Sequence, residues 1–128
     1  MRRIKEHKYV MKYLWERWRN YPQWRRVRLG PYPTQEMARM YMVILRWCDA
    51  IVADFKTRTI YIIEAKRKPT PWAVDQLKTY MRLFRQTPEF REFWDWQIKG
   101  ILVAPRVDAE TVKRCNEEGI IFELFPED

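Results

Sequence analysis

Residue types that support several common catalytic mechanisms are missing or scarce in this 128-residue chain. It contains no serine, which excludes hydrolysis through a serine nucleophile and serine recombination. His7 is its single histidine, so a histidine-rich zinc site is excluded and a nuclease site built on histidine and a metal is disfavoured. Its three glycines provide neither a phosphate-binding loop nor a dinucleotide-binding fingerprint.

The cysteines, the apolar residues and the length indicate the cellular compartment and the domain organisation of the protein. Cys48 and Cys115 form no metal-type pair, so we expect two reduced, buried thiols rather than part of a four-cysteine cluster. No apolar run approaches the roughly 18 residues of a membrane span and no secretory signal is visible, which predicts a cytoplasmic protein. The length predicts one domain over residues 1–128, and the scarcity of serine and asparagine favours a thermophilic source.

The positive charge is concentrated in the first thirty residues. These hold ten lysines and arginines against two acids, an excess equal to the net charge of +8 of the whole chain. A basic segment interleaved with aromatic residues predicts contact with a polyanion, above all DNA; the alternative is a solvated helix face. The candidate phosphate contacts, including two cations further along the chain, are Arg2, Arg3, Arg17, Arg19, Arg25, Arg26, Arg28, Arg67 and Lys68.

Hydrophobic periodicity and turn residues predict alternating helices and strands. The first helix is expected to bury Ile4, His7, Met11, Leu14 and Trp18. Within the ambiguous residues 31–46, a helix capped by Thr34 is one interpretation. The other expected elements are helices at 3–19, 72–85 and 108–118, a short helix at 89–96, and strands at 26–29, 48–54, 60–66, 99–105 and 120–125.

Three charged residues lie at the open end of the expected hairpin 48–54/60–66. Asp49 is near the start of its first strand, and Glu64 and Lys66 are near the end of its second. Because side chains alternate along a strand, Glu64 and Lys66 face the same side. Two half-buried carboxylates repel each other unless a cation is close, so the pattern favours a divalent metal beside a lysine, the chemistry of phosphodiester cleavage. We assign Asp54 to the turn.

These residues, together with Gln76-Leu77-Lys78-Thr79-Tyr80, resemble the D…E-x-K and Q-x-x-x-Y motifs of the PD-(D/E)xK nuclease superfamily. This superfamily includes restriction endonucleases, Holliday-junction resolvases and nucleases of the RecB and lambda-exonuclease type. The chain departs from the motif at Cys48, which stands in the place of the proline. The resemblance implies an α/β fold: a restriction endonuclease-like αβββαβ core with a mixed central sheet, plus a C-terminal αβ extension.

The resemblance also implies a metal site. Asp49, Glu64 and the backbone carbonyl of Ala65 would bind Mg²⁺ or Mn²⁺. Lys66, protonated beside the carboxylates, would orient the attacking water and stabilise charge on the phosphate. The alternatives without a catalytic role are a structural acid pair at a strand end for Asp49 and Glu64, and an ordinary surface lysine for Lys66.

Further residues would complete this site. Gln76 and Tyr80, four apart on one helix, would face it, although a helix-surface pair is the simpler explanation. An acid of the first helix would join the metal ligands; Glu6 is the first choice, and Glu16 and Glu36 remain alternatives.

Three functions are compatible with these observations. The first is a metal-dependent nuclease that hydrolyses DNA phosphodiester bonds. The second is a non-catalytic nuclease-fold domain, structural or DNA-binding, in a phage, archaeal-virus or mobile-element assembly. A third is a subunit of a larger recombination or transposition enzyme.

The aromatic residues suggest a homodimer. Phe90, Phe93, Trp94 and Trp96 crowd one short segment, and such a segment is hard to bury completely in a small domain. Because a duplex has two strands, a compact nuclease with one site usually pairs about a two-fold axis. We therefore expect a dimer through this segment or through the aromatics of the first helix; the alternative is that residues 90–96 close over the protein's own core.

Overall fold

The structure, a computed structural model, describes residues 2–32 and 46–127, with side chains from Glu6 onward. The helix expected around Thr34, and with it Glu36, lies outside the described residues. The elements are α1 (Arg2–Trp18), β1 (Gln23–Leu29), β2 (Arg46–Asp54), β3 (Thr59–Ala65), α3 (Pro71–Phe84), the 3-10 helix η1 (Pro88–Phe93), β4 (Gln97–Ala104), α4 (Ala109–Glu118) and β5 (Ile121–Leu124). The expected order of elements is thus confirmed in the described part of the chain.

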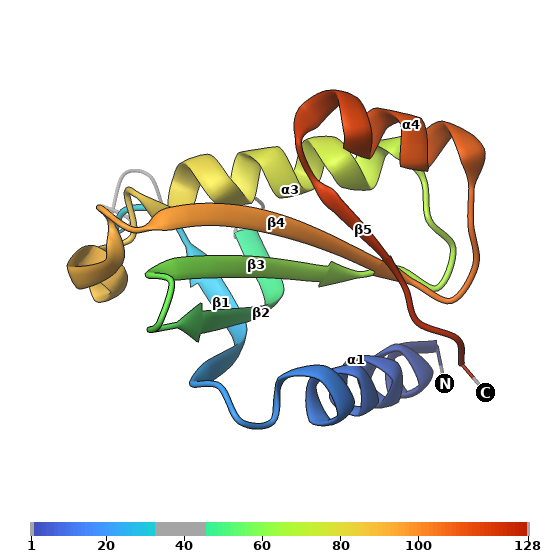
Figure 1. The fold of residues 1–128 in the computed structure, drawn as a ribbon, viewed down its shortest axis with the longest axis horizontal. Helices are drawn as coiled ribbons and strands as arrows, with labels where there is room; N and C mark the ends of the chain where they lie inside the picture. The colour runs from blue at the N-terminus through green and yellow to red at the C-terminus, as the bar shows by residue number, and fades with distance from the viewer. Residues whose placement is uncertain (1, 33–45, 128) are drawn as a thin grey trace.

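The five strands form one mixed sheet in the order β1-β2-β3-β4-β5. β1, β2 and β3 are antiparallel neighbours, and β3, β4 and β5 are parallel. α1 covers one face, while α3 and α4 lie on the other, and the two termini lie near each other (Figure 1). This arrangement confirms the predicted α/β fold with a mixed central sheet.

Side chains of β2 and β3 alternate between the two faces of the sheet, so each strand contributes to two separate cores. Ile51 and Ile62 pack on the face covered by α3, whereas Val52 and Ile63 pack on the face covered by α1. Gly100 in β4 lets α3 approach closely, since a Cβ there would come within 2.9 Å of the Met81 sulfur. The sheet is therefore covered on both sides.

The buried face of α1 differs from the predicted one. His7 is exposed and Met11 is only half-buried, so the expected stripe is wrong at these positions. Tyr9, Tyr13 and Leu14 are buried instead. The tyrosines were overlooked because their hydroxyls are polar, but Tyr9 donates to the carbonyl of Phe125 at 2.7 Å and Tyr13 to the Glu123 carboxylate at 2.7 Å.

The aromatic segment 90–96 closes over the protein's own core. Phe90, Phe93 and Trp96 are buried, and their rings pack edge-on or tilted against one another and against Trp24. The expectation that these three residues form an exposed dimer surface is therefore wrong. Dimerisation itself stays a prediction. Trp15, which is exposed on α1, is the aromatic residue of the first helix that could form such a contact without leaving the core.

Other local predictions are confirmed. Asp108 caps α4 by accepting from the Thr111 N–H at 3.0 Å, and Gly119 ends the helix in the left-handed conformation. Both cysteines are free and buried. In residues 2–32 and 46–127, no helix combines the length and the apolar character that a membrane span requires.

Candidate active site

The candidate site lies where β2 and β3 separate. Their ladder runs inward from Ala50 paired with Ile63, and Asp49 and Glu64 are the next residues outward. Beyond this point β2 stays with β1, with Val27 opposite Cys48, while β3 stays with β4. The acids therefore occupy the opening between two halves of the sheet.

Each carboxylate bonds the backbone of the opposite strand at this opening. The Ala65 N–H donates to Asp49 Oδ2 at 2.8 Å, and the Asp49 N–H donates to Glu64 Oε1 at 3.2 Å. Side-chain oxygens thus replace carbonyl oxygens as the strands part, which fixes the two acids side by side. Lys66 follows directly, and its own N–H donates to the Val103 carbonyl at 2.8 Å.

The electrostatics of the pair disfavour a double negative charge. Glu64 is only 5% exposed, and this burial, together with the charge of Asp49, raises its pKa to about 8. Burial also raises the pKa of Asp49, against the hydrogen bond from the Ala65 N–H. Lys66 offsets part of this cost, because its Nζ lies 3.5 Å from Glu64 Oε2. Among the described residues, Lys66 is the cation within ion-pair distance of the pair.

A cavity of about 440 Å³ opens onto the pair. Asp49, Glu64, Ala65 and Lys66 line it, so the predicted core of the site is brought together. Glu6 lines it from α1, and its charge contributes to the raised pKa of Asp49. Within the described ranges, however, no three His, Cys, Asp or Glu side chains are grouped as metal ligands would be. Glu6 is thus a neighbour of the acid pair without forming a three-acid cluster with it.

Gln76 and Tyr80 lie together on α3. Gln76 Nε2 donates to the Tyr80 hydroxyl at 2.9 Å, and Tyr80 is buried. Burial raises the pKa of Tyr80, and the charges of Glu64 and Asp49 raise it further. Gln76 Oε1 is buried and has no hydrogen-bond donor among the described residues. A buried amide oxygen without a donor is costly unless something else satisfies it.

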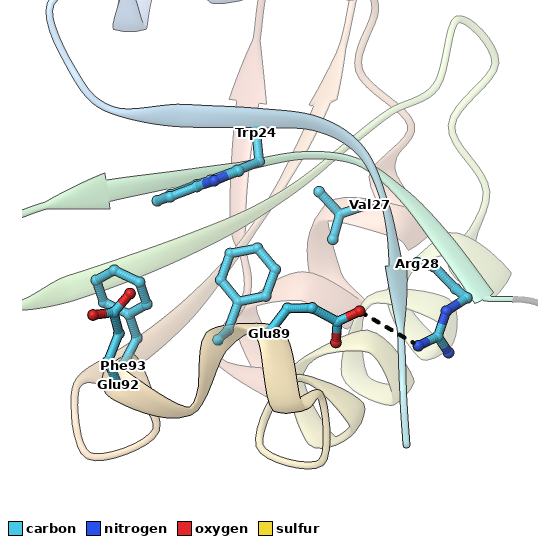
Figure 2. A pocket seen from close by; sticks show the side chains of 7 residues that line it. Trp24, Val27, Arg28, Glu89, Glu92 and Phe93 are labelled. Carbon is cyan, nitrogen blue, oxygen red and sulfur yellow. Dashed lines mark ion pairs between the residues drawn. The ribbon is translucent and has the colours of Figure 1, made fainter. Parts of the chain in front are cut away.

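Several arginines predicted to contact phosphate have acidic partners within the protein. Arg17 Nε lies 3.0 Å from Glu123, and Arg67 Nε lies 2.9 Å from Glu127. Figure 2 shows Arg28 directed at Glu89, with a nitrogen–oxygen distance of 3.8 Å, beside a pocket lined by Trp24, Val27, Phe90 and Phe93.

The remaining expected cations differ in position. Arg25 and Arg26 line the acid cavity, and neither has an ion-pair partner in the part of the chain that the structure describes. Arg19 donates to the Trp15 carbonyl at 3.2 Å and lies over that residue's ring. Lys68 lines a neighbouring hollow. The side chains of Arg2 and Arg3 lie outside the described residues.

Two of the other predicted acids have local explanations. Glu16 lies 4.0 Å from Lys12 on the surface of α1 and is not among the residues that line the cavity of the acid pair. Asp54 accepts from the Lys56 and Thr57 N–H groups at 3.0 and 3.4 Å, which confirms it as a turn residue.

Sequence reasoning missed three residues around the site. Arg106 lines the same hollow as Lys66 and Lys68, and it follows β4 as Lys66 follows β3. The parallel pairing of these two strands would have placed it there, because their carboxyl ends meet at one edge. Trp72 and Arg46 lie beside Gln76. Trp72 could have been noticed because it precedes the apolar stripe of α3 without belonging to it.

Comparison with known proteins defines the class. Residues 32–127, well over half of the chain, match the family described as the endonuclease NucS C-terminal domain. The chain therefore belongs to this family. No match was found among the curated proteins.

Three solved structures share the fold. A repair endonuclease from Pyrococcus abyssi is 21% identical with a TM-score of 0.61, over 93% of this chain and 46% of that one. A complex of EndoMS with dsDNA is 19% identical with a TM-score of 0.61, over 97% and 46%. EndoMS in its apo form is 20% identical with a TM-score of 0.57, over 95% and 47%. The chain spans less than half the length of these proteins.

Proposed function

We propose that this chain is the catalytic domain of a divalent-metal-dependent DNA endonuclease of the PD-(D/E)xK type. The observation that carries the proposal is the buried Asp49–Glu64 pair, with a single lysine 3.5 Å from Glu64. Membership of the endonuclease NucS C-terminal domain family supports nuclease chemistry. The likeness of the fold to EndoMS in complex with dsDNA supports DNA as the substrate.

The donor atoms of the pair fit Mg²⁺ or Mn²⁺. Asp49 and Glu64 offer carboxylate oxygens, the hard ligands that these cations prefer. A divalent cation would also favour the charged forms of both acids, against the burial that raises both pKa values and the charge of Asp49 that raises that of Glu64. The orphaned Gln76 Oε1 adds a buried oxygen that a metal-bound water could satisfy. When bound, the metal would lower the pKa of a coordinated water and polarise the scissile phosphate.

The protein's own residues would have separate roles in hydrolysis. The Lys66 ammonium would donate to the attacking water or to a phosphate oxygen as negative charge develops there. Arg25 and Arg26 line the same cavity, and they would hold the backbone of the DNA in it. Tyr80 remains protonated because its pKa is raised, and its hydroxyl fixes the Gln76 amide through the 2.9 Å hydrogen bond.

Cleavage assays test the proposal directly. Supercoiled plasmid and linear duplexes should be cut by the wild-type chain with Mg²⁺ or Mn²⁺, and not with EDTA. Glu64→Gln and Lys66→Met should lose cleavage while keeping the circular dichroism spectrum of the wild type. Cleavage by Glu64→Gln at the wild-type rate would contradict the assignment.

Calorimetry separates this proposal from the alternatives. We expect Mg²⁺ or Mn²⁺ to bind the wild-type chain and not Glu64→Gln. If neither metal binds and no form of DNA is cut, while DNA still binds, the chain is a non-catalytic DNA-binding domain. Cleavage that appears only when a second protein is added would assign it to a larger enzyme.

A further inference from the structure

Trp72 is an exposed aromatic residue beside the candidate site. It lies in the first turn of α3 and is 62% exposed, although the next two residues, Ala73 and Val74, are fully buried. An indole that contributes little to the core at this position has no evident role in stability. The ring is therefore available to a ligand.

Trp72 lies where two hollows meet. The first is lined by Glu6, Lys66, Arg67, Lys68, Thr70, Trp72 and Arg106. It shares Glu6 and Lys66 with the cavity of the acid pair. The second hollow joins Trp72 to Gln76 and Tyr80. The indole thus lines one hollow with Lys66 and another with Gln76.

The charge around the ring suits a nucleotide. Lys68 and Arg106 line the first hollow and Arg46 lines the second. None of these three has an ion-pair partner within residues 2–32 and 46–127. Cations that flank an exposed aromatic ring can bind phosphates on either side of a base stacked on the ring. An acidic protein segment would match the cations but would leave the indole without a partner.

We propose that Trp72 stacks on a base of the nucleic acid next to the scissile phosphate, with Lys68 and Arg106 contacting adjacent phosphates. The proposal rests on the proposed function, because it takes DNA as the ligand of the acid site. Inside a continuous duplex both faces of each base are covered by its neighbours, so the stacked base must lie in a single strand or be splayed out of the duplex. Trp72 therefore favours a site next to single-stranded or splayed DNA.

The test compares matched DNA substrates with EDTA present, which prevents cleavage. One is a blunt duplex, and one carries a five-nucleotide single-stranded end in which each position in turn is 2-aminopurine or abasic. Trp72→Ala should weaken binding of the single-stranded end about tenfold, and that of the blunt duplex by less than twofold. Trp72→Phe should keep most of the affinity. At one position, an abasic site should remove the difference between wild type and Trp72→Ala.

Spectroscopy supplies a second readout. The wild type and Trp72→Phe should quench 2-aminopurine at that same position, and Trp72→Ala should not. Phe55→Ala is the control, because Phe55 is also an exposed aromatic, 57%, but lies at the opposite end of the β2–β3 hairpin. It should bind both substrates as the wild type does.

The outcomes separate the two proposals. Equal losses for both substrates, or a loss that survives the abasic site, would overturn the stacking role while leaving the nuclease assignment intact. Unchanged DNA affinity in Trp72→Ala would also overturn the stacking role. A wild-type chain that binds no DNA would overturn both.

Discussion

The two ends of the β2–β3 hairpin both carry acids, but hydrogen bonds stabilise the acid at the turn, whereas burial disfavours the charged forms of the acids at the open end. At the turn, the Asp54 carboxylate accepts two turn N–H groups, and the neighbouring Arg58 pairs with Asp95 at 3.1 Å. At the open end, Asp49 and Glu64 lie side by side with burial raising both pKa values. The turn acid is explained by the structure it stabilises. The open-end acids cost stability, and a cost of this kind is typical of functional sites.

The contrast extends to the arginines. Arg58 at the turn has an acidic partner and lies over the Trp96 ring. Arg25 and Arg26 face the open end, where the structure gives them a sulfur atom and an indole ring as neighbours: Met11 for Arg25 and Trp47 for Arg26. Two cations of the cavity thus have no acidic partner among the described residues, while Asp49 and Glu64 share Lys66. This is the arrangement that an anionic substrate and a divalent cation would complete together.

The largest difference should appear in cleavage. Glu64→Gln keeps the size of the side chain but removes a charge, so the cleavage rate should fall by at least about 100-fold. Asp54→Asn makes the same chemical change at the other end of the hairpin, and its rate should stay near that of the wild type. The rates are measured on labelled duplex with saturating Mg²⁺. Equal losses in the two variants would remove the distinction between the ends.

The second difference should appear in stability against pH. Folding raises the pKa of Glu64 from 4.5 to about 8, so the folded state keeps its proton while the unfolded state loses it. The stabilisation is complete below pH 4.5 and is lost as pH rises towards 8, at roughly 1.4 kcal/mol for each pH step of one between these two values. Without metal, the wild type should therefore lose more free energy of unfolding between pH 5 and 8 than Glu64→Gln.

Urea denaturation in EDTA measures this loss. The exposed groups are the same in both chains, so their titration cancels in the comparison. Adding Mg²⁺ at pH 8 should stabilise the wild type and not Glu64→Gln, because only a bound ligand shifts the folding equilibrium. Parallel pH curves for the two chains would show that Glu64 is ionised in the folded state.

A smaller difference is expected in the salt dependence of DNA binding. Arg26 and Arg58 both have a φ of 52°, so each is replaced by Asn, which tolerates this conformation. Arg25→Ala combined with Arg26→Asn should lower the slope of log K against log salt by about 1.8, at 0.9 per phosphate contact. Arg58→Asn should leave the slope unchanged. Identical slopes in all three chains would assign Arg25 and Arg26 to a solvated surface.

The smallest effect belongs to the turn. Asp54→Ala removes the acceptor of two turn N–H groups and should lower the free energy of unfolding by about 1 kcal/mol. Asp54→Asn should cost less, because the amide oxygen still accepts. Thermal denaturation of both variants checks this order, and a larger loss from Asn than from Ala would contradict it.

Much of the fold could be predicted because it depends on local rules. The apolar alternation of β2 and β3 places their residues in two cores, and Asp108 and Gly119 delimit α4 where the sequence predicts it. The face of α1 could not be predicted in the same way. Its buried residues include Tyr9 and Tyr13, and their hydroxyls are satisfied by acceptors more than 100 residues away along the chain.

The candidate site likewise has features that local sequence predicts and features that depend on the tertiary structure. The sequence by itself determined the acids, the lysine and their order on a hairpin, because a period of two and a turn at Asp54 follow from neighbouring residues. Only the tertiary structure decided that β2 and β3 part at Asp49 and Glu64 and that Arg17 pairs with Glu123. It also decided that Trp72 lies exposed in the hollow lined by Lys66. Burial, pKa and ion pairing depend on which distant segments meet, and no local pattern contains that information.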